Sequence, residues 1–146
     1  MKLLSNMHEI NFKKLHVDAI TPTQGYKSDA AFDLYTYQTV YIHVNEVKLI
    51  NIGIAIELPS FLCAIIRARS SQHTKGIFVY PGLIDPDYRG DIGPVIYNFS
   101  RTSVRYVPGD RVGQLQFMYV PKISLKEVSK INVTDRNTNR CGSTGR

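Results

Sequence analysis

Short runs rich in Val, Ile, Tyr and Phe alternate with turn sequences along most of this chain. Residues of these types favour strands, and Pro and Gly between the runs favour turns. No long segment has the 3.6-residue periodicity of an amphipathic helix. Regular short strands of this kind are typical of an antiparallel sandwich, a jelly roll or a distorted barrel, so an all-β fold is predicted. The expected strands span 40–44, 48–58, 61–69, 76–80, 92–99, 103–107 and 112–120.

Length and composition fit one globular domain. The 146 residues suffice to bury a sizeable core. The longest apolar runs, such as 61–66, are too short to span a membrane. The N-terminus lacks the sustained apolar stretch of a signal peptide. The sequence therefore predicts an intracellular protein with no membrane partner.

The two cysteines, Cys63 and Cys141, do not form a CxxC pair. Neither a disulfide framework nor a cysteine metal site is predicted. The four histidines also lack the spacing of metal ligands. Cys63 lies in an apolar run and is predicted to belong to the core.

The net charge of +6 favours contact with phosphates without saying which ones. Lys and Arg are spread along the chain, whereas nucleic-acid binders commonly concentrate them on one element. No basic and aromatic platform for nucleic acid is apparent, so no nucleic-acid partner is predicted. A solvated basic surface remains an alternative on charge alone.

The last residues, 134–146, are polar, contain glycine and have few apolar side chains. We predict a body at 1–133 followed by a flexible C-terminal arm, because a segment of this composition cannot order by itself. The preceding stretch 123–131 is ambiguous between a short helix and an edge strand.

Several stretches carry more polar chemistry than strand connections need. Asp33 lies between two apolar neighbours at a strand start, where a carboxylate needs a cationic or hydrogen-bonding partner. At the end of another run, Arg69, Ser70 and Ser71 combine a guanidinium with hydroxyl groups that suit phosphate oxygens. An exposed loop aspartate and an ordinary serine turn remain the alternatives.

The stretch GLIDPDYRG, residues 82–90, holds two carboxylates and a tyrosine between two glycines. Pro86 stiffens the turn, so Asp85 would be held in a fixed position, as a general base requires. Tyr88 could lay its ring against a flat or sugar-like ligand. A hairpin with solvated carboxylates remains possible, as does a routine turn for PGDRVGQL at 108–115, which contains Gln114.

Taken in order, these stretches and the terminal GSTG resemble the trimeric dUTP pyrophosphatase (dUTPase) family. The resemblance covers nearly the whole chain. It implies a jelly roll that assembles as a homotrimer with active sites at subunit interfaces. The C-terminal arm of one subunit would close over a site built by others.

The resemblance also implies the reaction, which is hydrolysis of dUTP at the α-phosphorus to dUMP and pyrophosphate. Asp85 would activate the attacking water, Tyr88 would stack on the deoxyribose, and backbone groups at Gly82 and Gly93 would read uracil. The tight pocket would exclude the thymine methyl group.

On the phosphate side, the resemblance places Arg69 and Ser70 against the phosphates, with Ser71 beside them, and Gln114 near the α-phosphate and the water. Asp33 would orient the arginine and the metal-bound water. Mg²⁺ would be carried by the triphosphate. The arm would clamp the outer phosphates, with residues Arg136, Ser143 and Thr144.

The chain departs from the family pattern at several positions. Ser71 and Gln72 stand where a glycine and an apolar residue are usual, and Gly113 stands where alanine is usual. In the arm, Arg140 replaces a glycine and Cys141 occupies the position of an aromatic residue that stacks over uracil. Loss of stacking predicts weaker substrate affinity, by about 1–3 kcal/mol.

Two other functions are compatible with the same fold. A dCTP deaminase would need a glutamate near Val95 for proton transfer, and valine cannot move protons. A binding protein that had lost catalysis would not need Asp85, Tyr88 and Gln114. Both alternatives are therefore less favoured than dUTP hydrolysis.

Overall fold

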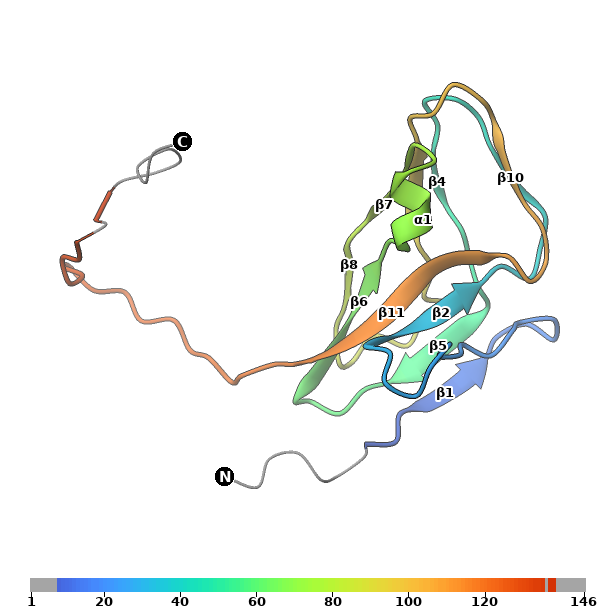
Figure 1. Cartoon of the computed structure of the whole chain (residues 1–146). Helices are drawn as coiled ribbons and strands as arrows, with labels where there is room; N and C mark the ends of the chain where they lie inside the picture. Colours follow the sequence, from blue (N-terminus) through green and yellow to red (C-terminus); the bar gives the residue numbers. More distant parts are fainter. Residues whose placement is uncertain (1–7, 136, 139–146) are drawn as a thin grey trace.

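The computed structural model describes residues 8–135 and 137–138. Its regular secondary structure is almost entirely strand, which confirms the all-β prediction. The strands are β1 (Asn11–Lys14), β2 (Ala31–Tyr35), β3 (Val40–Ile42), β4 (Val47–Leu49), β5 (Ile54–Glu57), β6 (Leu62–Arg67), β7 (Ile77–Tyr80), β8 (Gly82–Ile84), β9 (Val95–Asn98), β10 (Val104–Tyr106) and β11 (Arg111–Tyr119); the single-turn helix α1 (Ser70–His73) follows β6 (Figure 1).

The strands form a jelly-roll-like body of small antiparallel sheets. The largest sheet has the order β2-β11-β6-β8, a second has the order β4-β9-β7, and β1-β5 and β10-β3 form two-stranded pairs. Within the described residues these sheets do not close into one barrel. Of the predicted architectures, the jelly roll is therefore the one observed.

β11 is the longest strand and the centre of the largest sheet. It pairs with β2 on one side and with β6 on the other. Buried and half-buried residues alternate from Gly113 to Gln116, because successive side chains of a strand point to opposite faces, and the register shift at Val112 lets both Val112 and Leu115 be fully buried. One face of β11 therefore contributes to the core while the other carries polar side chains.

The core is built mainly from branched aliphatic side chains, which pack well on pleated strands. It unites strands from all the sheets, and Cys63 is buried beside it, as predicted. Its fully buried members include Leu34, Ile42, Ile52, Ile54, Ile96 and Val112.

The stretch 123–131, for which the sequence leaves a helix and a strand open, forms neither. After β11 the chain leaves the body as an extended segment (Figure 1). Its apolar side chains are exposed, with Leu125 98% accessible. Neither expected structure forms because nothing in the described part of this chain packs against the segment.

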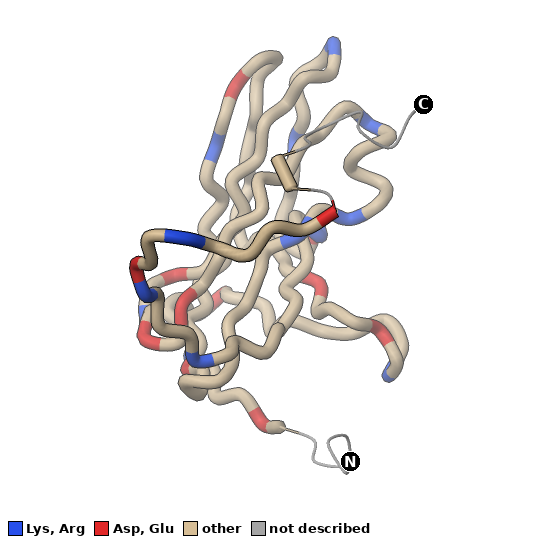
Figure 2. The backbone as a smooth tube through the Cα atoms, turned by 90° about the vertical axis from the view of Figure 1, so that its left-hand side faces the viewer, with Lys and Arg blue, Asp and Glu red and all other residues tan. Residues whose placement is uncertain are grey.

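Charged residues are distributed over the whole backbone, and both signs occur in most regions (Figure 2). This agrees with the even spread of Lys and Arg in the sequence. Within the described residues, no helix is long and apolar enough to cross a membrane.

Candidate active site

The register of the largest sheet aligns polar residues on three neighbouring strands. Gln114 of β11 lies directly opposite Asp33 of β2 and opposite Arg67 of β6. Residues directly opposite each other in an antiparallel pair project from the same face. The sheet thereby brings together Asp33 and Gln114, which are 81 positions apart in the sequence.

Asp33 is the centre of this group. Its Oδ1 accepts hydrogen bonds from Arg69 Nε and Gln114 Nε2, both at 3.2 Å. Its Oδ2 lies 3.2 Å from Arg111 Nε. With only 7% of its surface exposed, the carboxylate needs these partners, because a buried charge without them would be costly. The expected cationic partner of Asp33 is therefore found.

Arg111 was not predicted from the sequence, although it lies inside the PGDRVGQL stretch. Its guanidinium carbon lies 6.0 Å from the centre of the Tyr35 ring. A hydrogen bond to the Tyr35 side chain, followed by the charge of Asp33, raises the pKa of Arg111 above its usual value. Arg111 follows Asp110 in a polar stretch, which could have marked it as a candidate site residue. The sequence does not show which carboxylate it binds.

Helix α1 carries the serines of the second polar stretch. Ser70 and Ser71 are exposed, whereas Gln72 is only 5% exposed. The Arg69 backbone has an extended conformation at the helix start. The side chain of Arg69 can therefore leave the turn toward Asp33, while the serine hydroxyls face solvent.

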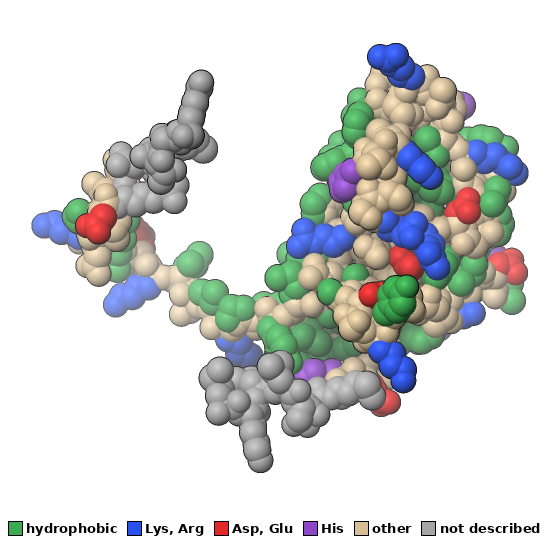
Figure 3. Space-filling model, viewed as in Figure 1, with side chains coloured by type: hydrophobic (Ala, Val, Ile, Leu, Met, Phe, Trp, Pro, Cys, Tyr) green, Lys and Arg blue, Asp and Glu red, His purple; other side chains and the backbone are tan. Residues whose placement is uncertain are grey.

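A basic pocket of 530 Å³ lies beside this group. Figure 3 shows Lys and Arg side chains on the face of the body that carries α1 and β11. Charge of this sign, concentrated in a concave site, favours an anionic ligand. The pocket is lined by Tyr35, Arg69, Ser71, Gln72, Lys75, Ile77, Val104, Arg105, Tyr106, Gly109, Asp110 and Arg111.

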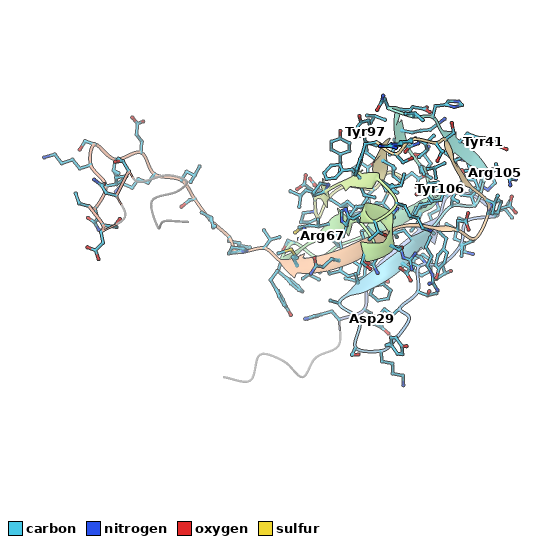
Figure 4. All side chains as sticks on the ribbon, turned by 45° about the horizontal axis from the view of Figure 1, so that its top comes forward. Asp29, Tyr41, Arg67, Tyr97, Arg105 and Tyr106 are labelled. Atoms are coloured by element: carbon cyan, nitrogen blue, oxygen red, sulfur yellow. The ribbon has the colours of Figure 1, made fainter. Side chains whose placement is uncertain are left out.

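Strand β10 forms one wall of the basic pocket. Figure 4 shows Arg105 beside Tyr41 at the outer edge of the body, with Tyr106 placed inward. Burial raises the pKa of the Tyr106 phenol, although a hydrogen bond with Gln72 opposes this shift. Tyr106 therefore stays neutral at physiological pH and contributes a polar but uncharged group.

The GLIDPDYRG stretch builds a second pocket, of 240 Å³. Asp85 lies directly after β8, exposed at the pocket, and the Tyr88 hydroxyl donates to the Asp91 carbonyl oxygen at 3.2 Å. The structure thus brings Gly82, Asp85, Tyr88 and Gly93 together at one pocket. The pocket is lined by Leu49, Ile66, Gly82, Leu83, Ile84, Asp85, Tyr88, Asp91, Ile92 and Gly93.

Asp91 is a structural residue of this pocket that sequence reasoning missed. Its carboxylate accepts hydrogen bonds from the backbone N–H groups of Gly53, at 2.9 Å, and Ile54, at 3.2 Å. Gly53 has a φ of +70° and lies against the side chains of Ala19 and His16. Asp91 therefore fixes the hairpin to a tight turn before β5, a contact that only the folded chain creates.

The glycines of the hairpin have different physical roles. A Cβ at Gly93 would collide with the backbone carbonyl oxygen of Ile50, and a Cβ at Gly90 would collide with the Tyr88 ring. A Cβ at Gly82 would meet Ile66 only at 3.8 Å, an ordinary contact. Packing against the backbone therefore requires glycine at position 93, a side chain at position 90 would displace the exposed Tyr88 ring, and Gly82 leaves backbone open toward the pocket.

The hydrogen-bonded group around Asp33 and the hairpin pocket that contains Asp85 lie apart within one chain. Ile84, which precedes Asp85, pairs with Ala64 of β6, and Arg69 lies five positions beyond Ala64 in the sequence. At the rise of a strand this separates Asp85 from Arg69 by roughly 15 Å. The arm residues Arg136, Ser143 and Thr144, and also Cys141, lie outside the described residues.

An arginine pair held on a buried carboxylate beside a basic pocket, with a separate hairpin pocket on the same jelly-roll-like body, is an arrangement that favours a phosphate-bearing ligand. The sequence model of the family described as dUTPase matches residues 17–145. The chain belongs to the dUTPase family. The predicted family and enzyme class, a nucleotide hydrolase, are thereby confirmed.

Individual relatives agree with this assignment. The deoxyuridine 5′-triphosphate nucleotidohydrolase of Trichodesmium erythraeum is 36% identical over 140 residues, which cover 94% of this chain and 99% of that protein. The enzyme of the same name from Clostridioides difficile is 34% identical, with coverage of 95% and 99%. The one from variola virus is 35% identical, with coverage of 93% and 92%.

Solved structures agree on the fold. A mutant dUTPase of Staphylococcus bacteriophage 80alpha, with dUpNHpp, superposes with a TM-score of 0.90 at 23% identity, covering 96% of this chain and all of that chain. A mutant dUTPase of phage phi11 of S. aureus, described with a structural Mg(II) ion, gives a TM-score of 0.80 at 20% identity, covering 85% and 99%.

Proposed function

We propose that this protein hydrolyses dUTP at the α-phosphorus to give dUMP and pyrophosphate. The observation that carries the proposal is the hydrogen-bonded group in which Asp33 holds both Arg69 and Gln114. A guanidinium and an amide fixed by the same carboxylate form a preorganised phosphate site, and preorganised charge is a major source of catalysis.

The hairpin pocket is proposed to bind the deoxyuridine. Backbone groups at Gly82 and Gly93 would read the uracil edge, and the Tyr88 ring would lie against the deoxyribose. Asp85, exposed after β8, would accept a proton from the water that attacks the α-phosphorus. A pocket of 240 Å³ is small enough for a base and sugar, so the methyl group of thymine would be excluded by steric clash.

The basic pocket is proposed to bind the phosphates. Arg69 offers its free guanidinium nitrogens, while Ser70 and Ser71 add hydroxyl donors from α1. Gln114 would contact the α-phosphate region and the attacking water. The charge that develops on the phosphate oxygens would then meet fixed positive groups in a concave site.

Mg²⁺ is proposed to arrive with the triphosphate and to neutralise part of its charge. Both oxygens of Asp33 are occupied by Arg69, Gln114 and Arg111, so this carboxylate would act on metal-bound water rather than on the ion. Within the described ranges, no group of three or more His, Cys, Asp or Glu side chains could hold a metal. These residues fit an ion that keeps several waters and binds phosphate oxygens.

A complete site is proposed to need more than one copy of the chain. Asp85 and Arg69 must act on the same phosphorus, yet the register places them roughly 15 Å apart in one chain. The hairpin pocket of one copy would face the basic pocket of another. A homotrimer, as the family resemblance implies, would supply three such sites.

The C-terminal segment supports assembly. Ile123, Leu125, Ile131 and Val133 are each at least 75% exposed, and such a series of apolar side chains usually marks an interaction surface. We propose that the body spans 1–133 and that the arm, 134–146, closes over a neighbouring site with Arg136, Ser143 and Thr144. No membrane or nucleic-acid partner is proposed, and an intracellular location stays a prediction.

Pyrophosphate release tests this proposal. The purified protein is assayed with Mg²⁺ and dUTP, dCTP, dTTP or UTP, and we expect release from dUTP alone. Asp85→Asn should lower the rate by about 100-fold or more, the usual contribution of a general base. Asp87→Asn, two positions further along the same exposed turn, is the matched control and should keep the rate.

The other outcomes identify the alternatives. Ammonia release from dCTP would indicate a deaminase. A folded, assembled protein that releases pyrophosphate from none of the four nucleotides would refute the enzyme and favour an interaction protein on the same fold.

A further inference from the structure

Gln72 is a buried residue of α1, in the turn that follows Arg69. The family pattern has an apolar residue at this position. Gln72 Oε1 accepts a hydrogen bond from the Arg69 backbone N–H at 2.7 Å. Its Nε2 donates to the Val112 carbonyl oxygen at 3.0 Å. Only 5% of the residue is exposed, so both ends of the amide are satisfied inside the protein.

The hydrogen bond from the Arg69 backbone N–H to Gln72 Oε1 takes the place of the usual N-terminal cap of helix α1. In a capping box, the side chain of the first residue accepts a bond from the backbone N–H of the fourth, and the side chain of the fourth accepts one from the backbone N–H of the first. Arg69 has no side-chain acceptor, so it cannot supply its half. The Gln72 amide is therefore the group that fixes the Arg69 backbone while Asp33 fixes the Arg69 side chain.

The second bond reaches the irregular part of β11. The pairing of β11 with β2 shifts register between Arg111 and Gly113, so Val112 is the extra residue of a β-bulge, which leaves the ladder. Gln72 donates to the carbonyl that this bulge releases. Arg111 and Gln114, which flank the bulge, both bind Asp33.

We propose that Gln72 is a positioning residue for phosphate binding. By joining the Arg69 backbone to the bulge of β11, one side chain fixes the spacing between Arg69 on one element and Arg111 and Gln114 on the other. This inference rests on the proposed function, because it assigns Gln72 a part in holding the triphosphate of dUTP. Gln72 itself acts through its neighbours.

The test replaces Gln72 by methionine, which has a similar length and no hydrogen-bonding amide. We expect Gln72→Met to raise KM for dUTP roughly tenfold, the equivalent of about one lost hydrogen bond. Affinity for dUpNHpp should fall by a similar factor, while affinity for deoxyuridine, which has no phosphate, should change little. Gln72→Glu keeps an acceptor for the Arg69 N–H but turns a carboxylate oxygen toward the Val112 carbonyl, and should raise KM at least as much as Gln72→Met.

Asn98→Leu is the matched control. Asn98 is a fully buried amide of β9 that donates to the Ile42 and Thr102 carbonyl oxygens and, within the described residues, makes no hydrogen bond to Asp33, Arg69, Arg111 or Gln114. Both variants should lower the melting temperature, but only Gln72→Met should raise KM. A purely structural role for Gln72 predicts that both variants behave alike, and that result would overturn the inference.

A double-mutant cycle then asks whether Gln72 acts through Arg69. In an Arg69→Ala background, Gln72→Met should weaken dUpNHpp binding by less than about twofold, because the group that it positions is gone. An equal loss in both backgrounds would contradict the inference. If the wild-type protein does not hydrolyse dUTP, the proposed function fails separately. Binding of inorganic tripolyphosphate then decides, and equal or absent binding by wild type and Gln72→Met would refute the role of Gln72.

Discussion

Asp33 is the carboxylate that binds Arg69, Arg111 and Gln114. Replacing it by asparagine removes the negative charge with almost no change in the shape of the side chain. The asparagine oxygen can still accept from Arg69 and Gln114, but the negative charge is lost. The new amide nitrogen faces Arg111, where two donors meet without an acceptor. The substitution therefore tests whether the carboxylate charge orders the site.

The size of the effect follows from these bonds. A hydrogen bond that involves a charged group is about twice as strong as a neutral one. The Arg69 bond, with 28% of the arginine side chain exposed, would lose about 1 kcal/mol and the Gln114 bond about 0.5 kcal/mol. These two bonds together give a loss of about 1.5 kcal/mol, which corresponds to a melting temperature roughly 3–6 °C lower for a chain of this length. The two donors that meet at Arg111 add to this loss.

Calorimetry at fixed protein concentration measures the stability change, because the melting temperature of an oligomer depends on concentration. Steady-state kinetics with dUTP should show kcat/KM lowered by about tenfold or more, since Arg69 and Gln114 lose their fixed positions. Asp87→Asn removes the same charge from an exposed position and should change neither quantity.

Simple charge repulsion predicts the opposite kinetic result. If Asp33 acted mainly by repelling the triphosphate, its neutralisation would strengthen dUTP binding. An Asp33→Asn protein with unchanged stability and a lower KM would therefore refute the positioning role that the hydrogen bonds indicate.

Three further predictions concern stability. Gly113→Ala should stabilise the protein by about 0.4–1 kcal/mol, because a Cβ there meets its nearest neighbours at 3.4–3.7 Å; urea unfolding checks this, and a destabilised variant would contradict it. Asp91→Ala should cost about 3 kcal/mol, from two charged hydrogen bonds to Gly53 and Ile54, and an equal loss in Asp87→Ala would argue against it. Burial raises the pKa of Tyr106, so its contribution to the stability of the protein is fully present below the unfolded pKa and is lost as pH rises through the folded value. Tyr106→Phe should therefore flatten the decline of stability above about pH 10. An unchanged decline would count against this.

The strand prediction succeeded at the two longest observed strands, whereas the expected strand 48–58 was wrong as a single element, because the chain turns at Gly53, whose φ is +70°, and forms β4 and β5 instead. The runs at 61–69 and 112–120 correspond to β6 and β11. Their apolar residues form a continuous run in the first and alternate with polar residues in part of the second, and both patterns predict strands. β1 was missed because its residues NFKK are all exposed and it exists only through pairing with β5. β8 was missed because its three residues belong to a stretch that composition marks as a turn.

The predicted site residues separate into two groups for a similar reason. The order of the motifs identified Asp33, Arg69, Asp85, Tyr88 and Gln114, because each lies in a stretch with unusual polar chemistry. That order contains no distances, so it could not tell that Asp85 lies far from Arg69 in the same chain. This separation follows from the register of β6 with β8.

Strand propensity, turn chemistry and motif identity are local properties of the chain, so the all-β class, the family and the candidate site residues could be predicted from the sequence. Only the tertiary structure decided which partners those residues have. Asp33 meets Arg111, Asp91 holds the turn at Gly53, and Gln72 reaches the bulge at Val112. These contacts join positions far apart in the chain, and strand register, which no single segment encodes, sets them.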